Sequence, residues 1–226
     1  MWTPTSLATL NQPLMLKKSH TIMHVRYTYK MLPRLLLLLL LYSQSAAGQG
    51  TFGIGSTSAV LGQPLVDAVS GSQAEVSSAF GASGTVLVFW GNQCVWSQRY
   101  EARLKQAMRQ AVQNGLAVVL VNANDPVAFP RENAEESQQM ARQMGVEHYF
   151  LDTDGGLARA LGAQRIPHVF IFDGGKQLVY AGAIDDSPGD VALVQKNYLS
   201  DALAALRAGS APDPAETQPF GCRIKL

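Results

Sequence analysis

The chain has 226 residues, with 18 lysines and arginines, 17 aspartates and glutamates, and a formal net charge of +1. A chain of this length suggests one or two domains. Its balanced charge, without a basic stripe, argues against a nucleic-acid partner.

The first 48 residues have the pattern of a leader. Leu35 to Leu41 are seven consecutive leucines, preceded by Arg34 and followed by small residues up to Gly48. A positive residue, a short apolar run and small residues at its end are typical of a secretory signal peptide, for which Met31 is an ordinary start. The run is shorter than the roughly 20 residues that span a bilayer, so a retained membrane anchor is the weaker alternative. We predict export, to the periplasm or outside the cell, without stable membrane insertion after cleavage.

Removal of the leader changes the charge and defines the domain. Residues 1–48 hold five of the 18 basic residues and none of the 17 acidic ones, so the net charge of the remainder becomes −4. About 178 of the 226 residues remain, enough for one well-packed domain. We expect a flexible segment over 49–58, the domain over 59–209, and a proline-rich tail over 210–226.

Apolar runs predict buried strands, and they alternate with helical stripes. We expect strands over 85–90, 116–121, 146–151, 169–172 and 177–183. We expect helices over 95–114, 133–144, 157–161 and 191–206. This alternation favours an α/β domain in which a central mixed sheet is flanked by helices and closes with an antiparallel strand pair and a C-terminal helix.

Cys94 follows the first predicted strand and its aromatic pair, Phe89 and Trp90, and immediately precedes a helix. Unpaired amides and the helix dipole favour a thiolate at a helix N-terminus. The small and polar residues over 91–93 suggest a turn that exposes the sulfur. The alternatives are a packed, inert thiol or half of a structural disulfide.

Cys222 is the second of two cysteines and lies in the tail, which we expect to be as mobile as other termini. It has three candidate roles: to resolve Cys94 after oxidation, to form a permanent structural bond, or to pair between chains. We favour exchangeable pairing with Cys94, because exchange depends on thiolate character and access.

We expect neither a metal nor an organic cofactor. Two of the four histidines lie in the leader and the two cysteines are far apart, so no metal-ligand spacing is present. Residues 53–55 contain two glycines but lack the strand and helix that surround a phosphate-binding loop. Asp185 and Asp186 follow a predicted strand, and we expect them to cap the last helix.

Two segments resemble the signatures of thioredoxin-fold proteins. Residues 89–97 (FWGNQCVWS) resemble the active-site segment, which places Cys94 at the nucleophile and Ser97 at the position of a resolving cysteine. Residues 165–170 (RIPHVF) resemble the loop whose cis-proline, here Pro167, faces that cysteine and pairs with a substrate chain.

A narrower resemblance covers nearly all of 55–226. The motifs that carry it occur in order at 92–94, 100–104, 122–125, 167–170, 182–186 and 221–225. They resemble the peroxiredoxin-like redoxins of the alkyl hydroperoxide reductase/thiol-specific antioxidant superfamily. The resemblance implies a thioredoxin fold, thiol-based redox chemistry and a role in redox homeostasis. It also implies a peroxide or a thiol- or disulfide-bearing protein as substrate, and an external reductant.

Three positions depart from the patterns of the relatives. Gly91 stands where ordinary peroxiredoxins have Thr or Ser, and Val88 stands where thioredoxin has a buried aspartate. Ser97 removes the adjacent resolving cysteine. These departures argue against fast peroxidase activity and against thioredoxin-style dithiol reduction.

We therefore predict an exported thiol–disulfide oxidoreductase with Cys94 as nucleophile and Cys222 as candidate resolving cysteine. The substrate groove is expected beside Pro167, lined by Trp90, Trp96, Ser97, Ile166 and His168. His168 is a candidate base, although a buried strand histidine is the more ordinary interpretation. A thiol peroxidase and a non-catalytic client-binding module are the alternatives.

Overall fold

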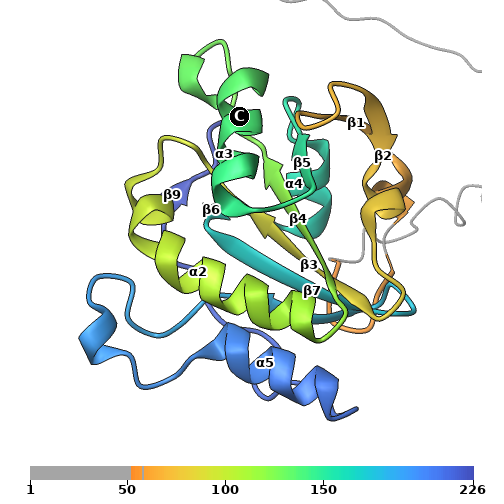
Figure 1. Cartoon of the computed structure of the whole chain (residues 1–226), viewed down its shortest axis with the longest axis vertical. Coiled ribbons are helices and arrows are strands. Elements are labelled where there is room, and N and C mark those ends of the chain that lie inside the picture. Colours follow the sequence, from red (N-terminus) through yellow and green to blue (C-terminus); the bar gives the residue numbers. More distant parts are fainter. Residues whose placement is uncertain (1–51, 58) are drawn as a thin grey trace, which may run out of the picture. The chain divides into compact units, whose positions relative to one another are not determined.

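The computed structural model describes residues 52–57 and 59–226 (Figure 1). The predicted leader over 1–48, with its start at Met31, lies outside the described residues. In the described part, no helix is both long and apolar enough to cross a bilayer.

A seven-stranded mixed sheet forms the centre of the fold, in the order β2-β1-β5-β4-β3-β7-β8. The strands are β1 (Pro64–Asp67), β2 (Gln73–Glu75), β3 (Gly84–Phe89), β4 (Ala117–Asn122), β5 (His148–Leu151), β7 (His168–Asp173) and β8 (Leu178–Gly182). Strands β3, β4 and β5 run parallel, and the other neighbours pair antiparallel. A separate antiparallel pair joins β6 (Arg165–Ile166) to β9 (Cys222–Arg223).

Helices cover both faces of the sheet (Figure 1). The α-helices are α2 (Val95–Gln113), α3 (Ala134–Met144), α4 (Gly156–Leu161) and α5 (Tyr198–Arg207). Short 3-10 turns are η1 (Ala59–Gly62), η2 (Val76–Ala79), η3 (Pro130–Glu132) and η4 (Val191–Leu193). Strand β3 is buried along its whole length, and its alternate residues enter two cores, one under α2, α3 and α5 and one under α4, η1 and η2. The predicted α/β fold class is thus confirmed.

The last helix is shorter than predicted, since α5 begins at Tyr198 and not at Val191. The reason is that backbone groups before it bond to another loop. Asp186 donates its N–H to the carbonyl of Lys196 and accepts the N–H of Gln195 on its carboxylate. The predicted cap is also wrong, because Asp185 forms a 2.6 Å ion pair with Arg103 on α2.

The C-terminal tail is bound to the domain along its length, contrary to the mobility expected from its prolines. Thr217 anchors its first part: its N–H bonds to the carbonyl of Ala181, and its hydroxyl lies 2.7 Å from the Tyr180 hydroxyl and 2.9 Å from the N–H of Ala183. We call residues 218–226, beyond this anchor, the C-terminal arm. The segment expected to be flexible is also bonded, since Gly55 and Ser56 exchange backbone hydrogen bonds with Leu178.

Candidate functional site

Cys94 occupies the N-cap position of α2, at the end of the loop that follows β3, as the sequence predicted. Its carbonyl accepts the N–H of Gln98 at 3.1 Å, which begins the helical hydrogen-bond series. Its side chain makes no capping hydrogen bond. The sulfur therefore stands at the positive end of a 19-residue helix.

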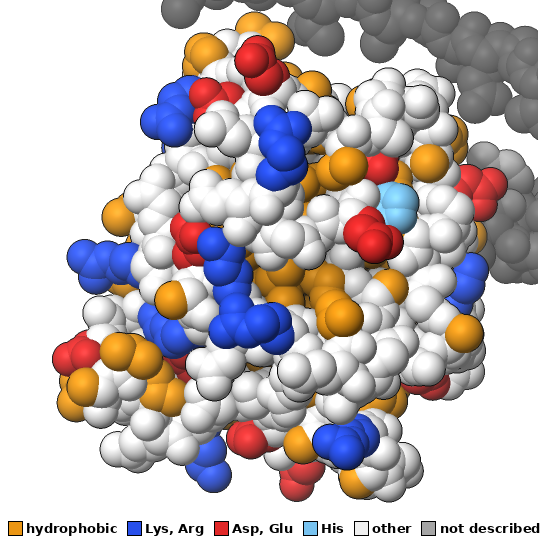
Figure 2. Space-filling view, in the orientation of Figure 1, with side chains coloured by type: hydrophobic (Ala, Val, Ile, Leu, Met, Phe, Trp, Pro, Cys, Tyr) orange, Lys and Arg blue, Asp and Glu red, His pale blue; other side chains and the backbone are white. Residues whose placement is uncertain are grey.

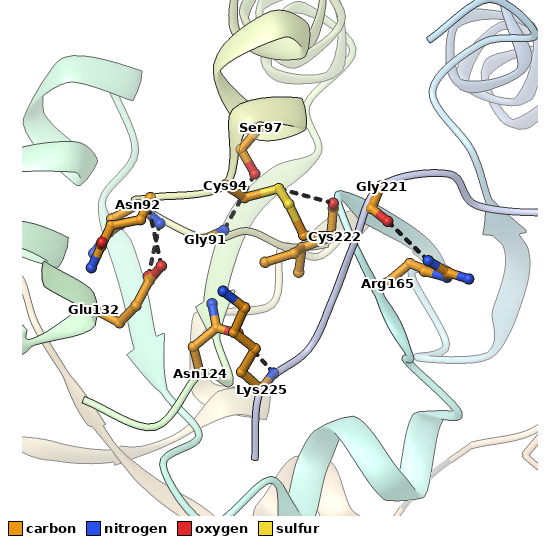
Figure 3. The surroundings of a disulfide bond; sticks show 12 residues. Gly91, Asn92, Cys94, Ser97, Asn124, Glu132, Arg165, Gly221, Cys222 and Lys225 are labelled. Atoms are coloured by element: carbon orange, nitrogen blue, oxygen red, sulfur yellow. Dashed lines mark hydrogen bonds between the residues drawn. A yellow bond between two sulfur atoms is a disulfide. The ribbon is translucent and has the colours of Figure 1, made fainter. Parts of the chain in front are cut away.

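Cys94 forms a disulfide with Cys222 of the same chain, 128 positions away, with the two Cα atoms 6.2 Å apart (Figure 3). Cys94 is 5% exposed. The expectation that the loop exposes this sulfur is wrong for the disulfide form, because the C-terminal arm covers it. Pairing between chains is likewise not what this structure shows.

Strand β9 of the arm lies along the proline loop. The Ile166–Pro167 peptide bond is cis, as the resemblance implied. Cys222 is the register partner of Ile166, and Arg165 is the partner of Arg223. The sulfur of Cys94 lies 3.5 Å from the Ile166 carbonyl oxygen. This contact is not a hydrogen bond while the disulfide is intact, because the sulfur then carries no proton.

Gly221 allows this close approach of the arm. A Cβ atom at this position would collide with the carbonyl oxygen of Ile166 and lie 2.7 Å from its carbonyl carbon. The guanidinium of Arg165 donates to the Gly221 carbonyl at 3.1 Å (Figure 3). The backbone of the arm thus packs directly on the proline loop.

Three more hydrogen bonds hold the end of the arm. Ile224 donates its N–H to the carbonyl of Gln164 at 3.1 Å. The carbonyl of Lys225 accepts the N–H of Asp125 at 2.7 Å, and the Lys225 N–H donates to the Asn124 side chain at 2.9 Å. Cys222 is therefore positioned by backbone bonds on both sides as well as by the disulfide.

Glu132 fixes the loop that carries Cys94. This carboxylate is 4% exposed and accepts the backbone N–H groups of Asn92 and Gln93 at 2.8 and 3.1 Å (Figure 3). It also accepts the side-chain amide of Asn122 at 2.8 Å. The sequence alone does not mark this residue, because it lies about 40 positions from the loop in a segment without periodicity.

The side chain of Asn92 extends the same buried network. Its amide group donates to the hydroxyl of Ser137 and the carbonyl of Arg131, both at 3.0 Å. Its oxygen accepts from the Tyr149 hydroxyl at 3.0 Å. Burial raises the pKa of Tyr149 well above its ordinary value, so the phenol keeps the proton that it donates.

Two side chains lie close to Gly91. A Cβ atom there would lie 2.5 Å from the Cδ1 of Ile166 and 2.9 Å from the side-chain nitrogen of Asn124. A Thr or Ser side chain therefore fits in the disulfide form only if the ends of these two side chains move aside. The N–H of Gly91 donates to the hydroxyl of Ser97 at 3.4 Å.

The residues expected to line a groove are divided by the structure. Trp96 and Ile166 gather around Cys94 in one core, and Trp96 stacks edge-on against Phe220 of the arm, with ring centroids 4.7 Å apart. Trp90 is 1% exposed and packs in the core on the opposite face of the sheet. Ser97 is fully buried. Neither Trp90 nor Ser97 can therefore line an open groove in this form, which corrects the prediction for both.

His168 is buried on β7, with its ring centroid 4.3 Å from that of Phe170. Among the described residues its Nδ1 has no hydrogen-bond partner. Burial lowers its pKa to about 4, so the ring is neutral near pH 7 and is a weak proton acceptor. This favours the ordinary interpretation of a strand histidine over that of a catalytic base.

In the described part of the chain, neither a metal-binding group nor the cavity between α2 and α3 involves the disulfide. Within residues 52–57 and 59–226, no three His, Cys, Asp or Glu side chains are grouped to hold a metal. A cavity of about 560 Å³ between α2 and α3 is lined by Met108, Val112 and Met144 with Lys105 and Arg109, and Figure 2 shows apolar side chains beside Lys and Arg on this face. None of the predicted site residues lines it, so the cysteine chemistry does not depend on this cavity.

Comparisons with known proteins agree with this geometry. The AhpC/TSA family model matches residues 64–181, slightly more than half of the chain. The chain belongs to the AhpC/TSA family. This confirms the predicted resemblance to thioredoxin-fold, peroxiredoxin-like redoxins. A comparison with curated proteins gave no match.

Solved structures of similar fold come from several bacteria. An uncharacterized conserved protein from Geobacillus kaustophilus is 25% identical with a TM-score of 0.68, and the match covers 78% of this chain and 94% of that one. The hypothetical protein SMc02350 from Sinorhizobium meliloti 1021 is 28% identical with a TM-score of 0.68, covering 76% and 94%. MTB dsbF, solved in mixed oxidized and reduced forms, is 18% identical with a TM-score of 0.49, covering 67% and 99%.

Proposed function

We propose that this AhpC/TSA-family protein is an exported thiol oxidoreductase whose redox centre is the Cys94–Cys222 pair. One observation carries the proposal: Cys222 is held against the helix-terminal Cys94 by its own two-residue ladder on the proline loop. A permanent structural bond does not require a helix N-terminus. A nucleophile benefits from one, because the helix end stabilises the thiolate.

The reduced protein starts the reaction with Cys94 as thiolate. With a disulfide substrate, the sulfur of Cys94 attacks one substrate sulfur, the substrate S–S bond breaks, and the departing thiolate takes a proton from water. The result is a mixed disulfide. Cys222, as thiolate, then attacks the sulfur of Cys94, forms the internal disulfide and releases the second substrate thiol. The substrate gains two electrons and the cysteine pair loses two.

With a peroxide, the first step differs. The Cys94 thiolate attacks one oxygen, the O–O bond breaks and an alcohol or water leaves after protonation, so Cys94 becomes a sulfenic acid. Cys222 attacks this sulfur and releases water, which yields the same internal disulfide. In both cycles an external thiol or dithiol restores the reduced pair. We favour disulfide substrates, because Gly91 lacks the hydroxyl side chain that ordinary peroxiredoxins have at this position.

The arm lies where a substrate chain would pair. Strand β9 lies antiparallel to β6 beside Pro167, with Cys222 opposite Ile166. A protein substrate that uses this backbone edge therefore needs the arm to leave, and we propose that reduction of the disulfide releases it. Thr217 remains as its anchor, because its hydrogen bonds to Tyr180, Ala181 and Ala183 do not involve the disulfide.

The experiment uses the reduced chain and its two single-cysteine variants. Oxidised glutathione or hydrogen peroxide is added, and the products are identified by mass spectrometry of the intact protein. We expect an internal disulfide in the wild type, a trapped mixed disulfide or sulfenic acid at Cys94 in Cys222→Ser, and no early product in Cys94→Ser. Equal reactivity of Cys94→Ser and the wild type would refute the proposal and favour a non-catalytic binding module.

Export is supported by the predicted leader and by the disulfide. Disulfides persist in oxidising compartments such as the periplasm and the cell exterior. Fractionation of cells that express the full chain, followed by N-terminal sequencing, tests this part. We expect a cleaved chain that begins close to residues 48–49, and an uncleaved chain in the cytosol would contradict it.

A further inference from the structure

A second cavity lies where α4 meets the β6–β9 pair. Its volume is about 380 Å³. Three arginines line it, Arg159 on α4, Arg165 on β6 and Arg223 on β9. Ile224 and Leu226 of the arm contribute an apolar wall.

The charged side chains at this cavity are all positive, and no ion pair within the described residues neutralises them. Arg165 and Arg223 are register partners, so their side chains leave the ladder on the same face, an arrangement that is unfavourable for like charges. No Asp or Glu lines the cavity, and none of the three arginines has an ion pair within 4.0 Å in the described part of the chain.

The hydrogen bonds that these arginines do make leave donors free. Arg159 donates to the backbone carbonyl of Asp154 at 2.6 Å, and Arg165 donates to the carbonyl of Gly221 at 3.1 Å. The Asp154 carboxylate instead accepts the N–H of Gly156 at 3.0 Å. Each guanidinium carries several N–H donors in a planar fork, so most of them have no partner among the described residues.

We infer that this cavity binds a small organic anion. Guanidinium forks match the two oxygens of a carboxylate or a phosphate group, so the charged end of the ligand lies among the three arginines. The rest of the ligand lies against Ile224 and Leu226. The ligand class is therefore a carboxylate or phosphate monoester with a short apolar body.

The site is coupled to the state of the arm. Arg223, Ile224 and Leu226 belong to the arm, whereas Arg159 and Arg165 belong to the body of the domain. The complete site exists only while the arm is docked, which is the disulfide form. By linkage, an anion that prefers this form also opposes reduction of the Cys94–Cys222 bond. This coupling rests on the proposed release of the arm, whereas binding to the disulfide form does not.

The test titrates inorganic phosphate and butyrate into the disulfide-bonded protein, at constant ionic strength with chloride, and follows binding by calorimetry and backbone NMR. We expect saturable binding of at least one probe, with shifts at β6 and β9. Arg159→Gln and Arg223→Gln should each weaken it about tenfold, the loss of one charge-assisted contact. Arg207→Gln, on the exposed end of α5, is the matched control and should leave the affinity unchanged.

The second part of the test compares the reduced and the disulfide-bonded protein. We expect the probe to bind the reduced protein at least about fivefold more weakly, and to shift a dithiothreitol equilibrium toward the disulfide by the same factor. Equal affinity in both states would overturn the coupling, and absent binding or an equal loss in Arg207→Gln would overturn the site. Neither result bears on the cysteine chemistry, which the Cys94→Ser and Cys222→Ser variants test separately. Thiol titration of Arg223→Gln verifies that its disulfide is intact.

Discussion

Cys222 lies directly opposite Ile166 in an antiparallel ladder, so the second cysteine reaches the first one along the backbone edge of the proline loop. The C-terminal arm is therefore held both by a covalent bond and by contacts with the proline loop. Backbone hydrogen bonds position the arm, and the disulfide closes it. Either one can therefore be weakened separately, which makes the contribution of docking measurable.

Gly221→Ala should weaken docking without touching either sulfur. The added methyl group collides with the backbone of Ile166, and backbone cannot move aside as a flexible side chain does. Overpacking of this kind costs roughly 1–3 kcal/mol. We expect the disulfide to become about ten- to a hundredfold easier to reduce, since 1.4 kcal/mol corresponds to a factor of about ten.

The measurement is the equilibrium constant with dithiothreitol, from the ratio of reduced to oxidised protein. Gly189→Ala is the control, because a Cβ atom at that position meets nothing within 4 Å. An unchanged constant in Gly221→Ala would show that the ladder does not contribute to the stability of the disulfide.

Glu132→Ala should destabilise the whole domain. It leaves the N–H groups of Asn92 and Gln93 and the amide of Asn122 without their acceptor in a buried site. Unsatisfied buried donors of this kind cost about 1–3 kcal/mol, and more when the lost partner is charged. We expect a loss of about 3 kcal/mol in urea unfolding, partly restored in Glu132→Gln, which keeps one acceptor oxygen.

The exposed Glu147 supplies a control for that experiment, since Glu147→Ala removes a carboxylate without a buried partner. A domain as stable in Glu132→Ala as in Glu147→Ala would mean that the loop before Cys94 does not depend on this carboxylate.

The sequence predicted the layers of the fold well because these depend on local patterns. The uncharged run over 85–90 forms β3, and the stripe from Trp96 to Met108 forms α2. Asn133 and Gly145, at the ends of a glutamate-led stretch, correctly predicted the bounds of α3. The Asn133 side chain accepts the N–H of Glu136 at the start of the helix, and Gly145 adopts the left-handed conformation at its end. These patterns are local and do not depend on residues that are distant in the sequence.

The site was harder to predict because its members meet only after folding. Nothing near Glu132 marks it as the acceptor for a loop 40 positions away. The prolines around Cys222 suggested a mobile tail, whereas the tail finds its hydrogen-bond partners on β8, β6 and the loop after β4. Trp90 was placed in the groove from the aromatic pair alone, but alternation along the strand sends it to the opposite face.

His168 should make stability dependent on pH. Its pKa is about 4 in the folded protein and 6.5 in the unfolded chain, because burial disfavours the charged ring. A group with a lowered folded pKa contributes stability above pH 6.5, and that contribution is lost as the pH falls toward 4. We expect the free energy of unfolding to drop by at most about 3 kcal/mol across this window.

Urea unfolding at a series of pH values from 7.5 to 4 checks this. In His168→Phe the drop should be smaller by the same amount. If His168→Phe retains the full slope, the histidine is not buried in its neutral form.

Gly91→Ser tests whether disulfide or peroxide substrates suit this site. The serine Cβ would lie 2.5 Å from the Ile166 side chain and 2.9 Å from the Asn124 amide, so these buried side chains must move aside. We expect a loss of stability of roughly 1–3 kcal/mol and no gain in the rate at which hydrogen peroxide oxidises Cys94. Gly62→Ser, at an exposed position where a Cβ atom would meet only the Glu75 side chain, at 3.9 Å, should change neither property. A faster reaction with peroxide at unchanged stability would mean that the reduced loop accommodates a hydroxyl, and a thiol peroxidase would then become the better description of the protein.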